Sequence, residues 1–506
     1  MIAHGRLPVM TNGWPSNQFT LDWVTGTLDL NLMNEPLRGG LSGSDKDSRP
    51  KGFRRIWTDS RTTQSGDLFI ALSGDRFDGH EFLTQAVNAG ARGLIIEKSK
   101  ENTLPQLDDS IVIIGVESTL NAYRSLAKAW REQFDVPVCV IAGSVGKTTT
   151  KDLLVSLLSK QFSSVLATEK SENGFIGIPK TLLRLNKTHE IAVIEVGIDE
   201  VGAMQKHLNL VQPDIGIVTA ISEEHLEKLM NMDQVTVEEG SLLNYVYART
   251  GKVVLNLDEP RLIGKRAMVL DPAHFKGGVA YTLHEKPAPH VIQGTYDAKK
   301  KTLEVSGGPY QKDSWNLPIE GEHNVTNLVG AIAMSHLCGV TPQNAKKGLA
   351  DFKVPFGRME IKTLSNGVKL IADYYNSSPQ AVRAAIVSLR TLSEREKRKR
   401  LWVGLGDMLE LGPDEEIFHR RLAHTIAAQE IDRVVLLGER MKWLHHELKK
   451  DPDYRKKTMH FESHAKLAAY LKDNLESEDI LLLKGSRGMR MEKILDLMNF
   501  KESDLK

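Results

Sequence analysis

The sequence predicts an α/β protein of three domains, and three observations lead to this fold class. The 506 residues give room for about three domains of ordinary size. Short β-branched runs alternate with helical patterns, which indicates parallel sheets covered by helices. A strand, a glycine loop and a helix follow one another at 136–158. We expect a small α/β domain at 1–134, a central parallel-sheet domain at 135–355 and a doubly wound, Rossmann-like α/β domain at 356–506.

The first domain is expected to form a small α/β unit. Residues 20–32 fit a short helix or a strand, and 39–52 have the Gly, Ser and charged composition of a flexible loop. Beyond them the pattern predicts strands at 68–72, 93–97 and 111–116 and helices at 81–88 and 120–134.

The central domain is expected to hold a parallel sheet that changes character after Asp258. Alternating runs at 290–296 and 302–305 then favour an antiparallel sub-sheet, and 324–338 favour a helix. The parallel strands are expected at 191–196, 215–220 and 252–256.

The last domain is expected to be doubly wound, with strands and helices in alternation. It lacks G-x-G-x-x-G in its first turn, so we expect it to supply residues to a neighbouring site and not to bind a dinucleotide alone. Its strands are expected at 369–373, 401–405, 433–437 and 480–484, and its helices near Pro379, Asp414, Glu439 and Ser463.

Composition narrows the classes of function. Lys and Arg number 66 against 65 Asp and Glu, which argues against nucleic acid or an anionic membrane as a partner. The only cysteines, Cys139 and Cys338, exclude a disulfide framework and a cysteine-rich metal site. No apolar run reaches the roughly 18 residues of a membrane span, and the N-terminus lacks the pattern of a signal peptide. We expect a cytoplasmic protein.

The loop at 143–148, GSVGKT, has the composition of a phosphate-binding P-loop. Its glycines let backbone N–H groups converge on phosphate oxygens at the start of a helix. Lys147 would reach the β- and γ-phosphates and the Thr148 hydroxyl would ligate Mg²⁺. Ile141 stands where the longer motif has a glycine, so an ordinary glycine turn before a helix is the alternative.

Two further residues follow predicted strands. Glu195 ends the strand at 191–196, and ligands of open α/β sheets collect at the carboxyl ends of strands, which places it to hold Mg²⁺ near Thr148. A capping or surface carboxylate is the alternative. His225 follows the next strand and offers a neutral imidazole to a metal, although a lone histidine there is more often a surface residue.

Together these motifs resemble the Mur ligase family, the ATP-dependent amide-forming enzymes of peptidoglycan precursor synthesis. The segments that carry the resemblance of the ATPase domain are GSVGKTTTKDLL and those at 170–185, 192–197, 213–227, 321–333 and 356–361. The first domain resembles a UDP-sugar-binding domain, and segments at 373–386, 406–412 and 482–492 resemble the member that acts last. The resemblance implies ATP and Mg²⁺ as cofactors and, as partners, UDP-N-acetylmuramoyl-tripeptide and D-alanyl-D-alanine, handled by a monomer.

The resemblance also implies roles for individual residues. The residues implied to bind ATP are Gly143, Ser144, Gly146, Lys147, Thr148, Thr149, Asn324 at the adenine, Arg358 and Asp373. Catalytic roles are implied for Lys147, Asn173 near the γ-phosphate, His225 and Arg358. The implied metal ligands are Thr148, Glu195, His225 and Glu239. Ser60 and Arg61, which alone favour a surface turn, are implied to bind the uridine diphosphate, and Lys484 and Ser486 the dipeptide.

Glu239 is a departure from the family pattern. Many members carry at this position a lysine, modified to a carbamate, that binds a second Mg²⁺. We hypothesise that the Glu239 carboxylate replaces the carbamate, since both offer a negatively charged oxygen pair to a hard cation. The alternative is a solvated helix residue beside a weakened metal site. A second departure is Gly174 after Asn173, where the last-acting members often have another asparagine.

Two other functions remain open from the sequence. A folylpolyglutamate-synthase-like or other amide ligase would share the ATPase core, although the DGHEF segment of the first domain argues against it. A non-catalytic nucleotide-binding relative is the other, because the lysine is missing at position 239.

Overall fold

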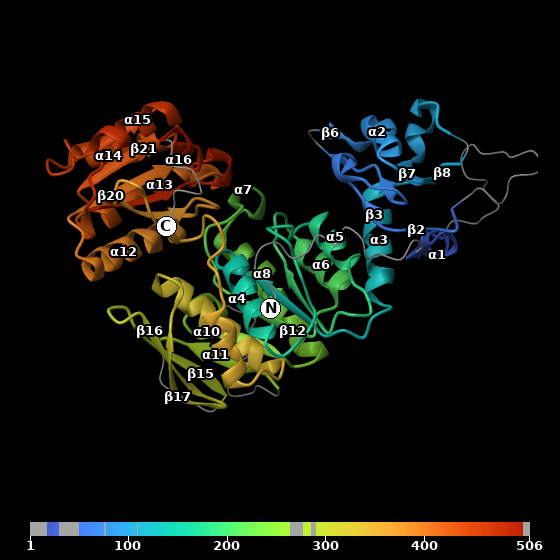
Figure 1. Cartoon of the computed structure of the whole chain (residues 1–506), viewed down its shortest axis with the longest axis horizontal. Coiled ribbons are helices and arrows are strands. Elements are labelled where there is room, and N and C mark those ends of the chain that lie inside the picture. Colours follow the sequence, from blue (N-terminus) through green and yellow to red (C-terminus); the bar gives the residue numbers. More distant parts are fainter. Residues whose placement is uncertain are drawn as a thin grey trace, which may run out of the picture. The chain divides into compact units, whose positions relative to one another are not determined.

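The computed structural model describes residues 18–29, 50–74, 77–108, 110–263, 277–284 and 290–498. The chain divides into two compact units (Figure 1). The first comprises Met1–Val136, Thr168–His189 and Asn209–Gln212, and the second comprises Pro137–Ala167, Glu190–Leu208 and Pro213–Lys506. Most of the flexible loop expected at 39–52 lies outside the described residues.

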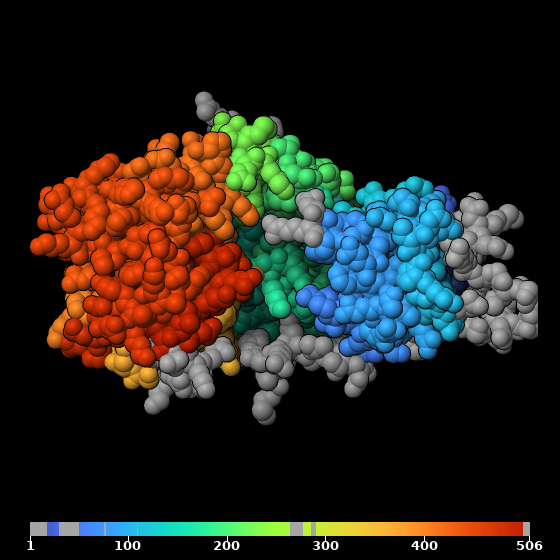
Figure 2. All heavy atoms as spheres, turned by 90° about the horizontal axis from the view of Figure 1, so that it is seen from above, coloured from blue at the N-terminus to red at the C-terminus, as the bar shows by residue number. Residues whose placement is uncertain are grey.

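The first unit contains the small α/β fold that the sequence predicts. Its parallel sheet has the order β3 (Ile56–Trp57), β4 (Leu68–Ile70), β7 (Gly93–Glu97) and β8 (Val112–Val116). Its helices are α1 (Leu21–Thr27), α2 (Leu83–Asn88), α3 (Thr119–Arg131) and α5 (Gly177–Leu182). Short antiparallel pairs join β1 (Phe19–Thr20) to β2 (Gly52–Phe53) and β5 (Ser73–Gly74) to β6 (Phe77–Asp78). Figure 2 draws the described residues between 50 and 131 of this unit in blue and cyan.

The second unit contains a nine-stranded sheet. Its order is β10 (Val165–Ala167), β11 (Ile191–Glu195), β9 (Val138–Ala142), β12 (Ile215–Val218), β13 (Val253–Asn256), β14 (Val279–Thr282), β15 (Val291–Asp297), β16 (Thr302–Gly307) and β17 (Tyr310–Asn316). Pairing is parallel as far as β15, and β16 and β17 are antiparallel. The antiparallel strands are as expected. They extend the parallel sheet, however, because β15 pairs with β14, so they form no separate sub-sheet.

Helices pack on this sheet around β9, the strand that precedes the glycine loop. Side chains of α4 (Lys147–Leu158), α10 (Glu322–Leu337) and α11 (Pro342–Ala350) share one apolar core with β9, β11 and β12. The helix α8 (Met232–Arg249) packs on β12 and β13. The shorter or more peripheral helices are α6 (Ala203–Val211), α7 (Leu226–Leu229) and α9 (Pro260–Ile263).

The second unit also contains a six-stranded sheet, in orange and red in Figure 1. Its order is β18 (Glu360–Thr363), β19 (Lys369–Asp373), β23 (Asp479–Lys484), β20 (Arg400–Gly406), β21 (Arg433–Leu437) and β22 (Thr458–Phe461), with only β18 antiparallel. The helices are α12 (Pro379–Glu396), α13 (Glu415–Ala428), α14 (Met441–Lys450), α15 (His464–Asn474) and α16 (Lys493–Leu497). Separate apolar clusters involve alternate residues of the strands, which confirms the doubly wound fold.

Two negative findings apply to the described parts of the chain. None of their helices combines the length and the apolar character that crossing a bilayer requires. Cys139 and Cys338 are free thiols whose Sγ atoms lie 3.5 Å apart, with Cys139 buried and Cys338 partly exposed.

Candidate active site

The glycine loop at 143–146 joins β9 directly to α4, in the middle of the parallel sheet. Gly143 has φ +119° and Gly146 has φ +90°, values that other residues rarely adopt. A Cβ on Gly143 would lie 2.4 Å from Thr219 Oγ1, and one on Gly146 would lie 2.4 Å from Asn327 Oδ1. Ile141 is a fully buried strand residue, so the turn begins after it and requires no glycine there. The loop thus has the tight backbone that a phosphate cradle requires.

Lys147, the first residue of α4, folds back over this loop. Its Nζ lies 2.6 Å from the Gly143 carbonyl oxygen, 3.2 Å from that of Ser144 and 3.1 Å from Glu224 Oε1. Burial lowers the pKa of the Lys147 ammonium, but three carboxylates, those of Glu224, Glu239 and Glu195, outweigh it and hold the pKa above its ordinary value. The loop therefore carries a protonated lysine at its end, whose charge is paired with Glu224.

Glu239, on α8, reaches the same loop. Its Oε2 accepts a hydrogen bond of 2.8 Å from the Gly143 amide, while its Oε1 is buried without a hydrogen-bond partner among the described residues. Burial raises the pKa of this carboxyl to about 8, against the attraction of Lys147. The residue is fully buried, so it is not the solvated helix residue of the alternative interpretation.

The other acidic residues lie on the carboxyl side of the sheet. Glu195, the last residue of β11, is almost fully buried beside Ile141 in the register, and Lys151 Nζ lies 4.0 Å from its Oε2. Glu224 is partly exposed, and its Oε1 lies 3.1 Å from Lys147 Nζ. Burial opposes its ionisation, but Lys147 and His225 hold its pKa below the ordinary value. Two carboxylates thus flank the helix that begins at Lys147.

His225 has a different environment from the one expected. Its Nδ1 lies 2.9 Å from Glu410 Oε2 and its Nε2 lies 3.5 Å from Glu224 Oε1. Burial lowers the pKa of the imidazole, but both carboxylates outweigh it and raise the pKa to about 9. The ring pairs with both carboxylates here. Metal binding at Nε2 would require that nitrogen to lose its proton and its contact with Glu224, whereas the Nδ1–H group can keep its bond to Glu410, as metal-bound histidines commonly do.

The donor set at the loop fits Mg²⁺ in its chemistry. Thr148, Glu195 and Glu239 offer hydroxyl and carboxylate oxygens, the ligands that this hard cation takes, and the Glu239 Oε1 atom is an orphaned buried acceptor. No three His, Cys, Asp or Glu side chains of the described chain converge to hold a metal by themselves. A Mg²⁺ ion here would draw further ligands from phosphate oxygens and water, as it commonly does.

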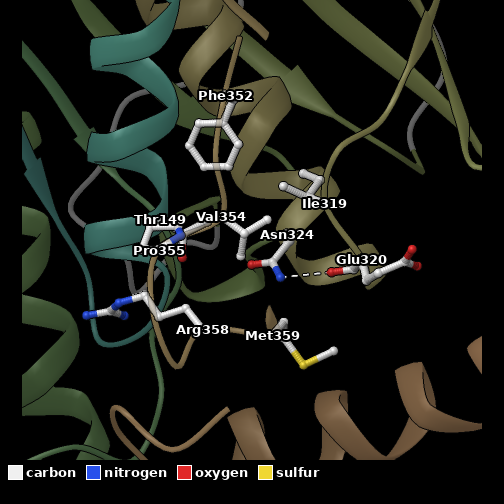
Figure 3. A pocket seen from close by; sticks show the side chains of 9 residues that line it. All are labelled: Thr149, Ile319, Glu320, Asn324, Phe352, Val354, Pro355, Arg358 and Met359. Atoms are coloured by element: carbon white, nitrogen blue, oxygen red, sulfur yellow. Dashed lines mark hydrogen bonds between the residues drawn. The ribbon is translucent and has the colours of Figure 1, made fainter. Parts of the chain in front are cut away.

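A small cavity opens beside the first turn of α4 (Figure 3). Thr149 from α4, Asn324 from α10 and Arg358 contribute its polar groups. Asn324 Nδ2 donates a hydrogen bond of 2.8 Å to the Glu320 carbonyl oxygen. The remaining lining residues are Ile319, Glu320, Phe352, Val354, Pro355 and Met359. The structure thus brings Asn324 and Arg358 together with the start of α4, as the resemblance implies.

The buried Lys484 forms an ion pair with the partly exposed Asp373 at the carboxyl edge of the six-stranded sheet. Asp373 Oδ2 lies 2.7 Å from Lys484 Nζ, and Asp373 Oδ1 accepts a hydrogen bond of 3.1 Å from the Met359 amide. Lys484 also donates to the Asn376 carbonyl at 2.8 Å. Ser486 is buried next to them and its Oγ accepts a hydrogen bond of 2.9 Å from the Leu409 amide.

The remaining expected site residues belong to the first unit. Ser60 is buried and its Oγ donates to Gln85 Oε1 at 3.0 Å. Arg61 is exposed and pairs with Asp59 at 2.8 Å. Asn173 lies in the segment before α5, and a Cβ on the following Gly174 would meet no atom within 4 Å.

Sequence reasoning missed several residues of the site. Glu224 directly precedes His225, and this position beside a candidate metal ligand could have identified it as a site residue. Tyr375 follows Asp373 by two residues and lies 4.1 Å from the Arg358 guanidinium, as a cation–π partner. Thr219, whose hydroxyl donates to the Val145 carbonyl at 2.5 Å, and Glu320 had no distinguishing pattern.

Comparison with known proteins gives the family. Residues 53–131 match the model of the Mur ligase family catalytic domain, 141–335 the Mur ligase middle domain and 357–487 the Mur ligase glutamate ligase domain. The UDP-N-acetylmuramoyl-tripeptide–D-alanyl-D-alanine ligase of Bacillus subtilis is 32% identical over 440 residues, which are 87% of this chain and 92% of that protein. The Escherichia coli protein of the same name is 30% identical over 93% of this chain and 98% of its own.

A solved structure agrees with these matches. The crystal structure of MurF from Acinetobacter baumannii has a TM-score of 0.78 and 26% sequence identity, and the match covers 95% of this chain and 99% of that one. Sequence and fold are therefore alike over nearly the full length of both chains. The chain belongs to the Mur ligase family.

Proposed function

We propose that this protein joins D-alanyl-D-alanine to UDP-N-acetylmuramoyl-tripeptide in an ATP- and Mg²⁺-dependent reaction, as a monomer in the cytoplasm. Membership of the Mur ligase family makes the chain a ligase. The single observation that supports the reaction best is the buried Lys147, which lies over a tight glycine loop near the carboxyl groups of Glu224, Glu239 and Glu195. Relatives named for this reaction match the chain over most of its length.

The chemistry sets what these residues must do. A peptide carboxylate is a poor electrophile, so its oxygen first attacks the γ-phosphorus of ATP and ADP leaves. The amine of the dipeptide then attacks the acyl phosphate carbon, phosphate leaves with the bonding electrons, and the amine loses a proton. Phosphoryl transfer of this kind depends on positioning and on neutralisation of charge.

The chain's residues are assigned accordingly. The loop from Gly143 to Thr148 would bind the phosphates, with Lys147 leaving Glu224 to reach their oxygens. Asn324 would bind the adenine, and Arg358 and Asp373 would contact ATP. We assign Asn173 to the γ-phosphate, Ser60 and Arg61 to the uridine diphosphate, and Lys484 and Ser486 to the dipeptide. The expected domains at 1–134, 135–355 and 356–506 each supply part of this set.

Mg²⁺ is assigned to Thr148, Glu195 and Glu239, with His225 joining them through Nε2 once that nitrogen loses its proton and its contact with Glu224. When bound, the ion neutralises the negative charge of the phosphates. The Glu239 carboxylate would replace the carbamate of other members, and its unpartnered Oε1 supports this assignment.

The test measures phosphate release from ATP with Mg²⁺, UDP-N-acetylmuramoyl-tripeptide and D-alanyl-D-alanine. Release that requires both peptide substrates, with the pentapeptide product seen by mass spectrometry, supports the proposal. Release without the dipeptide indicates another amide ligase, and no release indicates a non-catalytic relative. A Lys147→Ala variant is the blank for contaminating ATPases.

A further inference from the structure

Glu320 lines the cavity that contains Asn324, and two cations hold its carboxylate. Arg395 binds it with both terminal nitrogens, since Nη2 lies 2.6 Å from Oε1 and Nη1 lies 3.1 Å from Oε2. Lys301 Nζ lies 2.6 Å from the same Oε1. The Glu320 side chain is only 7% exposed, so water screens these charges weakly. This fork-to-carboxylate geometry fixes the orientation of the Glu320 side chain.

The two cations come from different sheets of the second unit. Arg395 lies in the last turn of α12, a helix of the six-stranded sheet. Lys301 lies in the turn between β15 and β16 of the nine-stranded sheet, and Arg395 also donates to the Ala298 carbonyl of that turn at 3.4 Å. The Arg395–Glu320–Lys301 cluster therefore joins both sheets just before α10 begins at Glu322.

The backbone of Glu320 in turn orients the Asn324 amide. One N–H of Asn324 Nδ2 donates to the Glu320 carbonyl at 2.8 Å, and Figure 3 shows Oδ1 on the side of the amide away from Glu320. A side-chain amide that is free to turn over can present either its donor or its acceptor. With one N–H used by Glu320, the Asn324 amide presents its oxygen and its other N–H in one order only.

This order matters because adenine and guanine differ at the edge that an asparagine contacts. Adenine presents an amino donor beside the N7 acceptor, which an asparagine amide matches with two hydrogen bonds. Guanine presents the O6 acceptor in place of the amino group. A fixed amide would therefore bind adenine and meet guanine with oxygen facing oxygen, whereas a mobile amide could turn over and accept both.

We propose that Arg395, acting through Glu320, is a positioning residue that fixes the Asn324 amide and thereby sets the preference for adenine over guanine nucleotides. This inference rests on the proposed function, in which Asn324 binds the nucleobase. It assigns a role in nucleobase specificity to Arg395, a residue of helix α12 that acts through Glu320.

The experiment determines KM and kcat for ATP and for GTP in the phosphate-release reaction with both peptide substrates. We expect Arg395→Ala to reduce the ratio of the GTP KM to the ATP KM by about tenfold or more, since a matched base pairing is worth about 1–3 kcal/mol. The kcat with ATP should change less than the ratio. Arg395→Lys, which keeps one charged contact, should recover part of the preference. Calorimetric titration with ADP and GDP should give the same ratio without turnover.

Arg390→Ala is the matched control. Arg390 lies on the same helix, but its guanidinium donates to the Gln429 carbonyl at 2.9 Å. Gln429 directly follows α13, so this contact stays among the helices of the six-stranded sheet. A general loosening of α12 would change both variants alike. Our inference requires the ratio to change in Arg395→Ala and to stay at the wild-type value in Arg390→Ala.

Asn324→Ala separates the role of Arg395 from the assignment of Asn324 to the nucleobase. If it abolishes the adenine preference while folded Arg395→Ala keeps the wild-type ratio, the role of Arg395 is overturned and the nucleobase assignment stands. If Asn324→Ala keeps the preference, the assignment of Asn324 to the base fails and the inference falls with it. Should Arg395→Ala not fold, Glu320→Gln, which keeps the shape and weakens both ion pairs, is judged by the same ratio.

Discussion

Glu239 on α8 accepts a hydrogen bond from the backbone amide of Gly143, with 2.8 Å between the two atoms. The residue that departs from the family pattern is thus bound to the first residue of the phosphate loop. One carboxylate oxygen orients the loop and the other is left without a partner among the described residues. A side chain in this position can act on the loop, on a cation beside it, or on both.

Glu239→Gln separates these two actions. Glutamine keeps an oxygen for the Gly143 amide but removes the negative charge that a cation would use. We expect the loop to stay intact and the Mg²⁺ concentration for half-maximal phosphate release to rise by about tenfold, the loss of roughly one charged contact. Glu238→Gln, next to it and bonded to the Gly202 amide at 2.7 Å, is the control. Wild-type Mg²⁺ dependence in Glu239→Gln would sink the metal assignment.

Gly146→Ala is expected to damage nucleotide binding through the backbone. The new Cβ would lie 2.4 Å from Asn327 Oδ1, and φ at this position is +90°. We expect ADP to bind more than about tenfold more weakly by calorimetry, because the loop must open to relieve the contact. Gly339→Ala has a similar φ of +84° but no atom within 4 Å of the added Cβ, so it controls for backbone strain alone. Equal ADP affinity in the two variants would contradict the steric explanation.

Much of the fold could be predicted from local patterns. The strands at 93–97, 369–373 and 433–437 have the predicted bounds, because each is a short β-branched or leucine-rich run that ends at a turn. The loop at 143–148 was equally recognisable, since its glycines serve a backbone requirement that adjacent residues reveal. The antiparallel strands were predicted too. That β15 pairs with β14 was not, because this depends on which edge strand of the parallel sheet is free to pair.

The less predictable part of the site consists of contacts between residues distant in sequence. Glu239 could be located by its register, but its burial against Gly143 depends on how α8 packs on β12 and β13. Arg395 and Glu320 belong to different sheets and no spacing relates them. His225 was assigned to a metal because it follows a strand. The structure pairs it with Glu410, which is 185 residues away in the sequence, so no local pattern could predict this contact.

Asp373→Asn is expected to destabilise the protein, because Lys484 is left as an uncompensated buried charge. Its side chain is 3% exposed and the Asp373 carboxylate lies 2.7 Å away. We expect a loss of about 3–5 kcal/mol in the free energy of unfolding of this part of the chain, followed by urea titration. Glu462→Gln breaks a pair whose side chains are 66% and 74% exposed, and it should cost far less than Asp373→Asn because water screens exposed charges. Similar losses in both variants would show that the burial of Lys484 is not what matters.

His323, one residue before Asn324, should make stability depend on pH. Burial lowers its pKa to about 4, Asp373 opposes the shift and Lys484 adds to it. The folded state therefore binds fewer protons than the unfolded state between about pH 4 and 6.5. The stabilisation is fully present above pH 6.5 and is lost as the pH falls through this window, by on the order of 1–3 kcal/mol. His323→Gln should flatten this part of the profile of unfolding temperature against pH, whereas the exposed His424→Gln should not. If both variants follow the wild-type profile, other groups cause the acid sensitivity and the buried Nδ1 atom of His323 has no energetic cost.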